Sequence, residues 1–268
     1  MIEIAISLAV IGFALVAIIG ILPTGMNVQK ENREETIIGQ EAGLFMEAIR
    51  SGARGMDDLT NYVDAITNYQ AAYGPNGSLL GRPVVFGYTY SNSSPINNFP
   101  LTNGFRIVGL LSAPKYLPGP NQAIRFLSNY TVAYVRSMSG PAGEKVPQNN
   151  PAIRELVFSY RLSSDVVPYA SYDPKWTNFT DISLYVPTTN FAEIVLRSNY
   201  WRLARNVQTN LYDLRLTFRW PLLANGNVGN GRQVFRTLVG GSLLATNDFG
   251  FPTYPLYFFE PRNYVKAP

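Results

Sequence analysis

Aspartates are the residues whose type and clustering could support acid–base or metal chemistry in this sequence. Asp57, Asp58 and Asp64 form one group, and Asp165 with Asp173 forms a second. Neither group has the alternating spacing of a Ca²⁺-binding loop. Aspartates in such positions are typical of helix caps and turns. We therefore predict no catalytic residue and no metal site from them.

Two absences narrow the chemistry further. The chain contains no cysteine and no histidine, so it lacks the usual general base near neutral pH and the commonest metal ligand. Ser-His-Asp catalysis, Cys-His catalysis and the familiar zinc sites are excluded, whereas carboxylate or lysine chemistry stays open. The glycine-rich run Gly229–Arg232 lacks the following helix and the Lys-Ser/Thr pair of a phosphate loop. The sequence predicts a protein that is not an enzyme and needs no cofactor.

The first 29 residues are apolar and carry a single charge, Glu3, before Lys30. A helix from Ile4 to Gln29 would be about 39 Å long, which exceeds the roughly 30 Å hydrocarbon core of a bilayer. Because it is apolar on all sides, this helix must lie in lipid or inside a bundle of similar helices. A signal peptide fits poorly because no Lys or Arg precedes the apolar run. A plain membrane anchor leaves the acid unexplained, since a carboxylate there is favourable only at the helix N-terminus or beside a cation.

A second helical pattern follows Lys30. Ile38, Ala42, Phe45 and Ile49 recur at intervals of three or four and predict an amphipathic helix that ends at Gly52 or Gly55. The opposite face is acidic, with Glu31, Glu34, Glu35, Glu41 and Glu47. Asp57 or Asp58 is predicted to cap a short second helix containing Leu59, Tyr62, Val63 and Ile66.

This arrangement resembles the N-terminal segment of type IV pilins and pseudopilins. The resemblance rests on Glu3, the apolar run Ile4–Leu22, Pro23 and the amphipathic continuation after Lys30. Gly20-Ile21-Leu22-Pro23-Thr24-Gly25 is similar to a "GxLPxG" ending found in large bacterial pilin-like proteins. The block from Trp220 to Thr237 is also similar to those proteins. In that family a prepilin peptidase removes a short basic leader, and the new N-terminus is methylated.

The resemblance implies specific roles in assembly. Glu3 would pair with the N-terminal amine of a neighbouring subunit, although it stands two residues earlier than the family's acid and no leader precedes it. Either the chain lacks its leader and two further residues, or its processing differs. Apolar side chains would form the filament core, namely Ile4, Leu8, Ile11, Phe13, Leu15, Ile18, Ile19 and Leu22. Around Gly20, Pro23 and Gly25 we predict a non-helical segment in the assembled form, with a simple kink as the alternative.

From Pro83 onward, short β-branched or aromatic runs between turn residues predict strands. They are Val84–Tyr90, Phe105–Leu111, Thr131–Arg136, Ile153–Leu162, Ile182–Val186, Ile194–Ser198, Tyr200–Val207 and Leu211–Trp220, with Gln233–Val239 as the hairpin partner of the last. Residues 70–82 are predicted to be a loop. The fold class is α+β, a pilin-like long N-terminal helix packed on an antiparallel β-rich domain. The predicted divisions are 1–29 (hydrophobic helix), 30–69 (amphipathic continuation and short second helix) and 70–268 (β-rich head).

Charge and composition leave alternatives open. The net charge is +4, with −1 in residues 1–29 and −3 in residues 30–58, so the remainder carries +8. The acidic helix either complements the basic domain, within or between subunits, or forms a solvated face. No long Lys/Arg run exists, and no specific nucleic acid is predicted.

The aromatic, proline-rich segment Asp248–Pro268 is predicted either to cover the core or to dock on a neighbouring subunit. Four Asn-x-Ser/Thr matches, Asn76, Asn92, Asn129 and Asn178, are possible glycosylation sites.

The sequence thus predicts the major structural subunit of a type IV pilus-like extracellular filament, a helical homo-oligomer. The subunit would reside in the inner membrane, rely on the prepilin peptidase and the pilus assembly machinery, and then form a cell-surface filament, with adhesion among its roles. One alternative is a minor pseudopilin of a type II secretion or DNA-uptake machine. Another is a membrane-anchored sugar-binding or enzymatic domain.

Overall fold

A computed structural model describes residues 2–80, 86–92, 99–121, 123–139, 157–169, 191–223, 225–247 and 255–266. The chain divides into two compact units, 1–41 and 42–268, and each is treated by itself. A long N-terminal helix is followed by a domain built on an antiparallel β-sheet, which confirms the predicted order and class of elements. The predicted strand Ile182–Val186 and the first residues of Ile153–Leu162 lie outside the described residues.

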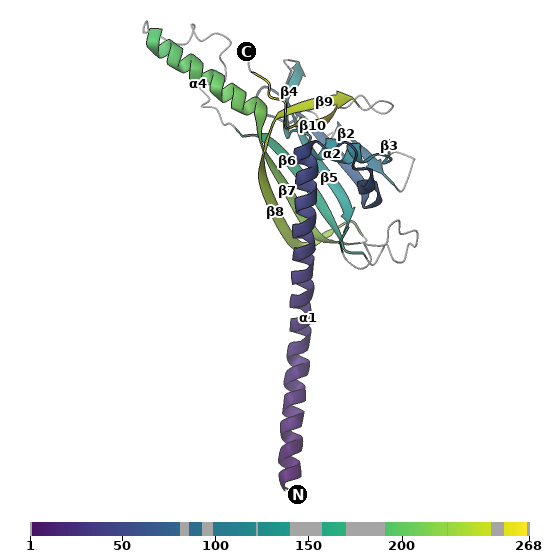
Figure 1. The fold of residues 1–268 in the computed structure, drawn as a ribbon. Helices are drawn as coiled ribbons and strands as arrows, with labels where there is room; N and C mark the ends of the chain where they lie inside the picture. Colours follow the sequence, from purple (N-terminus) through teal and green to yellow (C-terminus); the bar gives the residue numbers. More distant parts are fainter. Residues whose placement is uncertain are drawn as a thin grey trace. The chain divides into compact units, whose positions relative to one another are not determined.

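Helix α1 (Ile2–Ser51) opens the chain (Figure 1). Its end falls where the sequence predicts, because Gly52 adopts a φ of 64°, a left-handed conformation that favours glycine at a helix C-terminus. A side chain at Gly52 would also clash with the carbonyl oxygen of Phe259. Ala42, Phe45 and Ile49 are fully buried, as the predicted stripe requires, while Glu47 on the opposite face is exposed. Glu41 departs from the prediction, since it is buried.

The second unit is organised around an eight-stranded sheet (Figure 1). Its strands are β1 (Val63–Tyr73), β2 (Phe86–Ser91), β3 (Phe99–Pro100), β4 (Tyr116–Asn121), β5 (Ile124–Arg136), β6 (Ser159–Pro168), β7 (Leu211–Leu222) and β8 (Val228–Gly240). The order is β3-β2-β1-β5-β6-β7-β8, and β4 pairs with β5. All pairings are antiparallel except β2 with β3. A separate hairpin joins β9 (Ser242–Asn247) to β10 (Pro255–Glu260).

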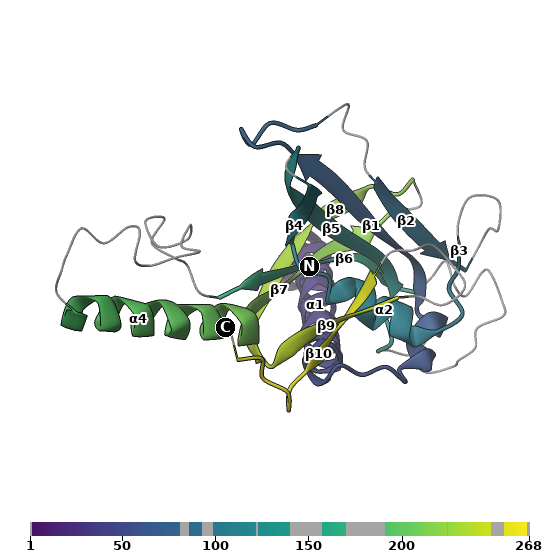
Figure 2. The ribbon, with the colours of Figure 1, turned by 90° about the horizontal axis from the view of Figure 1, so that it is seen from above.

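One face of this sheet is the inner face, and it carries the core. Leu162 on β6 and Leu216 and Phe218 on β7 are fully buried on it. It is covered by residues 42–51 of α1, by helix α2 (Gly104–Leu111) and by the β9–β10 hairpin (Figure 2). The Thr131 hydroxyl of β5 donates a hydrogen bond of 3.1 Å to the Leu110 carbonyl of α2, and this contact ties the helix to the sheet. The opposite, outer face holds the polar members of the alternating strands.

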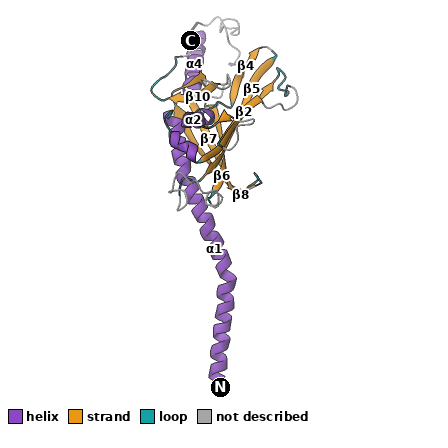
Figure 3. Cartoon of the chain, turned by 90° about the vertical axis from the view of Figure 1, so that its right-hand side faces the viewer, coloured by secondary structure: helices purple, strands orange, loops and turns teal. Residues whose placement is uncertain are grey.

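Three predicted strands lie in two helices, α2 and α4, and these predictions are wrong (Figure 3). Phe105–Leu111 lies in α2, where Ile107, Val108, Leu110 and Leu111 are buried. A short apolar run looks alike in a strand and in a buried helix, so periodicity alone does not separate them. Ile194–Ser198 and Tyr200–Val207 belong to a single helix, α4 (Phe191–Asn210). Good helix formers such as Ala, Glu, Leu and Arg outweigh its β-branched and aromatic residues.

The predicted second helix and the loop after it are also wrong. The Asp57 region forms only a short 3₁₀ helix, η1 (Asp57–Asn61), which buries Leu59. Val63 and Ile66 lie instead in β1, which continues through Tyr73 into the predicted loop. Val63 and Ile66 are β-branched, and both are fully buried against neighbours in the sheet. Long-range pairing with β2 and β5 therefore decides the conformation here.

The aromatic C-terminal segment covers the core, as one of its two predicted roles requires. Leu256, Tyr257, Phe258 and Phe259 are buried, and they lie in β10, a strand that the sequence did not indicate. At Gly109 of α2, an added Cβ would fall 2.8 Å from the Leu256 Cβ, so helix and strand pack closely. The described part of this segment beyond β10 is exposed.

The β7–β8 hairpin confirms the clearest sequence prediction but adds one surprise. Tyr212, Leu214, Leu216, Phe218 and Trp220 form one buried face, as predicted. On the other face Asp213 is only 3% exposed, although the alternation predicts a solvated side chain. Its carboxylate accepts hydrogen bonds from Nε of Arg215 (2.8 Å) and from Nε of Arg236 (2.6 Å). Burial alone would raise the pKa of the Asp213 carboxyl, but the two arginines outweigh burial and hold this pKa below its ordinary value of 3.8.

Because the pKa of Asp213 is lower in the folded state, its stabilising effect is present above pH 3.8 and is lost as the pH falls through the lowered value. At pH 7 we expect Asp213→Asn to lower the free energy of unfolding by about 1.5–3 kcal/mol, the range for hydrogen bonds to a charged group. The difference from the wild type should shrink below pH 4. Urea unfolding of the full chain in nonionic detergent, measured at pH 7 and at pH 3, tests this.

Asp165→Asn serves as the control for that measurement. Asp165 pairs with Lys115 at 3.0 Å, and both side chains are about one-third exposed. An ion pair with this exposure contributes ~0–1 kcal/mol. An equal, pH-independent loss in both variants would contradict the role of the Asp213 cluster.

Candidate functional site

The candidate functional site is the apolar segment of α1, residues 2–29. Its large apolar side chains are exposed on every side of the helix, from 49% at Val28 to 80% at Phe13. The other predicted core-forming residues are equally open, namely Ile4, Leu8, Ile11, Leu15, Ile18, Ile19 and Leu22. In the single chain, this segment therefore has no polar face that could lie against water.

Length and composition allow this helix to cross a membrane. Its most apolar 18-residue window has a mean hydropathy of 2.9 and is not buried. A single such helix near an N-terminus is also compatible with a signal sequence. This agrees in a coarse way with the predicted membrane location, while the extracellular filament stays a prediction.

Glu3 lies in the first turn of α1, where the positive end of the helix dipole favours a carboxylate. Its side chain is exposed. Among residues 2–80 and the other described ranges, no cation lies within ion-pair distance of its carboxylate. The backbone carbonyl of Glu3 accepts a hydrogen bond of 2.9 Å from the Ser7 hydroxyl. The arrangement leaves the carboxylate available to a partner outside the chain.

The segment Gly20–Gly25 is helical throughout in the single chain. Pro23 lacks an N–H, so it cannot donate to the carbonyl of residue 19. Around Gly20 and Gly25 a Cβ would meet nothing within 4 Å. Neighbouring side chains therefore do not enforce the helix here. The predicted non-helical segment concerns the assembled form and stays a prediction.

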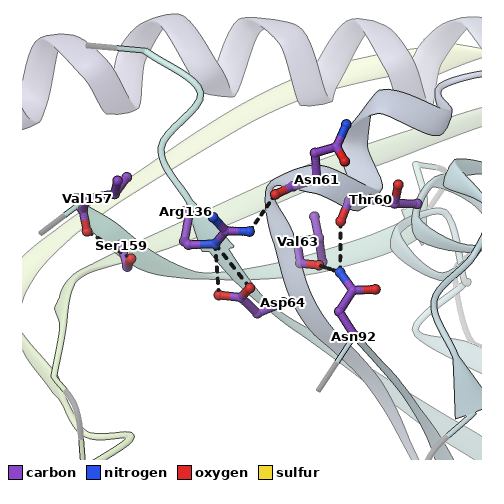
Figure 4. Close-up of polar contacts among 8 residues, drawn as sticks. All are labelled: Thr60, Asn61, Val63, Asp64, Asn92, Arg136, Val157 and Ser159. Atoms are coloured by element: carbon purple, nitrogen blue, oxygen red, sulfur yellow. Dashed lines mark hydrogen bonds and ion pairs between the residues drawn. The ribbon is translucent and has the colours of Figure 1, made fainter. Parts of the chain in front are cut away.

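The aspartates considered above for chemistry have structural roles. Asp57 accepts a hydrogen bond of 2.9 Å from the Gly104 amide, which fixes the start of α2. Figure 4 shows the Asp64 carboxylate facing the Arg136 guanidinium, with Nε 3.0 and 3.2 Å from its two oxygens. Asp173 lies outside the described residues. In the ranges that the structure describes, no three acidic residues come together as a possible metal site.

The possible glycosylation sites differ in accessibility. Asn76 is exposed in a turn. Asn129 is 4% exposed, and its Nδ2 donates to the Pro114 carbonyl (2.8 Å) while its Oδ1 accepts from Gln70 (2.9 Å). The Nδ2 of Asn92 donates to the carbonyls of Thr60 and Val63, both at 2.8 Å (Figure 4). A glycan would need the same Nδ2 atom, so the folded protein offers Asn76 and protects Asn129. Asn178 lies outside the described residues.

Sequence reasoning missed one group of charged residues. Strand pairing places Arg161, Arg219 and Arg232 directly opposite one another on β6, β7 and β8. These arginines are far apart in the sequence, so they do not form a basic run that could have predicted the group. The +8 charge of the chain beyond residue 58 was the one available signal.

Comparisons with known proteins do not add to this geometry. No family model, no curated protein and no solved structure matches the chain.

The two asparagines provide a matched test of the site assignments. We expect Asn129→Ala to lower the free energy of unfolding by about 1–3 kcal/mol, because it leaves the buried Pro114 carbonyl without its donor. Asn76→Ala should change it by less than about 0.5 kcal/mol. Urea unfolding measures both values. Peptide mapping of material from the natural host should find no glycan on Asn129, and an occupied Asn129 would contradict the structure.

Proposed function

We propose that the chain is the structural subunit of a type IV pilus-like extracellular filament, assembled through the apolar segment 2–29. The observation that carries the proposal is a helix of apolar side chains, exposed on all sides, with one acid in its first turn. The resemblance of these residues to pilins supports it. The β-rich unit that follows would coat the filament and determine its surface properties.

The energetics favour transfer of this segment from lipid to a protein bundle. Removing a large apolar side chain from water stabilises the segment by on the order of 1.5–3 kcal/mol. Both lipid and a bundle of like helices provide that gain, so the segment can be stored in the membrane before assembly. Packing against neighbouring copies then adds dispersion contacts. Repeated contacts between different faces of identical subunits, when they do not close into a ring, build a helical fibre.

Glu3 gives the assembly its specificity. A carboxylate buried without a partner in such a bundle would be strongly unfavourable, whereas one paired with a neighbour's N-terminal amine is tolerated. The pairing is satisfied only at one axial offset between two helices. Glu3 would therefore fix the stagger between successive subunits, while the apolar side chains supply most of the affinity.

Cryo-electron microscopy of sheared surface material from producing cells is the direct test. Long filaments with α1 in the core would support the proposal, and the map would show the partner of Glu3 and the conformation of Gly20–Gly25. Membrane-bound monomers alone would contradict it and favour an anchored binding domain. Short complexes with other proteins would favour a minor pseudopilin.

Substitution of Glu3 separates assembly from folding. We expect Glu3→Ala to reduce filament yield by roughly a hundredfold, which corresponds to about 3 kcal/mol lost when one partner of a buried ion pair is removed. The membrane level of the chain should not change, because the residue is exposed in the single chain. Yield is measured by immunoblotting of sheared and membrane fractions. Glu31→Ala, which removes an exposed acid outside the apolar segment, is the control, and an equal yield for both variants would exclude the pairing role.

A further inference from the structure

A row of three arginines crosses the outer face of the sheet. Arg161 on β6 lies opposite Arg219 on β7, and Arg219 lies opposite Arg232 on β8. On β5, Tyr134 lies opposite Arg161 and completes the row. Directly opposite residues share one face of a sheet, and neighbouring strands are about 4.8 Å apart. The four side chains thus span about 14 Å in a line.

The three arginines differ from other arginines on the same face. Arg136 is neutralised by Asp64 (Figure 4), and Arg215 and Arg236 share the carboxylate of Asp213. In contrast, no carboxylate within the described ranges lies within ion-pair distance of the row. Arg219 and Arg232 are exposed, and Arg161 is half-buried. The row therefore presents three positive charges that the described part of the chain leaves unneutralised.

Aromatic rings continue the same face on β1, β4 and β5. Tyr69 and Tyr130 are paired across β1 and β5 with ring centroids 6.3 Å apart, and they are 38% and 45% exposed. Tyr73 stacks on Phe126 at 4.8 Å, and Tyr116, which is 50% exposed, meets the Phe126 edge at 5.9 Å. By the alternation of β5, Phe126, Tyr130 and Tyr134 lie on the same side of the sheet. Tyr134 therefore lies in the arginine row itself, whereas Tyr130 and Tyr69 lie four residues further along their strands, about 13 Å from the row.

We propose that this outer face binds single-stranded nucleic acid, with Arg161, Arg219 and Arg232 contacting phosphates and Tyr134, Tyr130 and Tyr69 stacking bases. The guanidinium group matches phosphate geometry through two parallel hydrogen bonds. Aromatic faces stack any base, so binding needs no particular sequence. An acidic protein segment would use the arginines and leave the rings without a role, and a neutral glycan would do the reverse. A strand of nucleic acid carries both phosphates and bases, so it uses both groups.

This inference is independent of filament assembly. It rests on residues of the second unit alone, and it is measured on dispersed full-length chain in nonionic detergent. A chain that assembles without binding nucleic acid, or binds without assembling, would separate the two proposals.

The test is fluorescence anisotropy with labelled oligothymidylate over a series of salt concentrations. We expect the wild type to bind, with the logarithm of the association constant falling linearly with the logarithm of salt. The double variant Arg219→Gln/Arg232→Gln should flatten that slope by about 1.4, which is 0.7 for each lost phosphate contact to a single strand. Tyr130→Leu should weaken binding roughly tenfold with the slope unchanged, because stacking carries no charge.

Two matched controls lie outside the proposed face. Arg202 is exposed on α4, and Tyr264 is 64% exposed beyond β10. Arg202→Gln and Tyr264→Leu should leave both affinity and slope unchanged. Near-ultraviolet circular dichroism confirms that each variant is folded.

Several results would overturn the proposal. The first is an absence of oligothymidylate binding at micromolar concentrations of the chain. The second is an effect of the control variants equal to that of the arginine and tyrosine variants. The third is wild-type affinity in Tyr130→Leu. Dextran sulfate that competes as strongly, charge for charge, as the oligonucleotide would also overturn it, since the face would then recognise charge alone.

Discussion

The exposed apolar segment of α1 is the constraint on which the molecule depends. Side chains such as Ile4, Phe13 and Ile19 are exposed in the described part of the chain, so water cannot be their final environment. Whether the surroundings are lipid or a bundle, the segment needs continuous apolar contact and internally paired backbone. Helix satisfies the second requirement by itself. The domain beyond residue 42 has its own core, with Leu162, Leu216 and Phe218 fully buried, so it can keep its structure while the segment changes surroundings.

Patterns that span many residues were predictable from the sequence, and short ones were not. The alternation of β7 and its pairing with β8 follow from ten residues that agree on one period. The run Phe105–Leu111 has no polar residue except Arg106, so its period is undefined, and only the α2 contacts with β10 and β5 decide the matter. In α4 the β-branched and aromatic residues suggested two strands, although the segment forms one helix of 20 residues. For α2 tertiary contacts decide the conformation, whereas in α4 good helix formers outweigh the β-branched and aromatic residues.

The two candidate sites differ in what a sequence can reveal. Glu3 stands out because it is the single charge in a long apolar run, so the sequence alone marks it as a candidate. The arginine row is invisible until the strand register is known, because Arg161 and Arg219 are 58 positions apart and meet only through the pairing of β6 with β7. Asp213 was missed for a related reason. Its carboxylate accepts a hydrogen bond from Arg236, which comes from the neighbouring strand.

The distribution of acids on the outer face argues that the arginine row is more than a solubility device. Like charges directly opposite one another in a sheet destabilise it by up to about 1 kcal/mol per pair. The same face offsets this cost elsewhere, since Asp213 lies between Arg215 and Arg236, and Asp64 neutralises Arg136. A surface adapted only for solubility intersperses both signs. A row of three opposed arginines keeps its repulsion in the free chain, and the proposed anionic ligand would relieve that repulsion on binding.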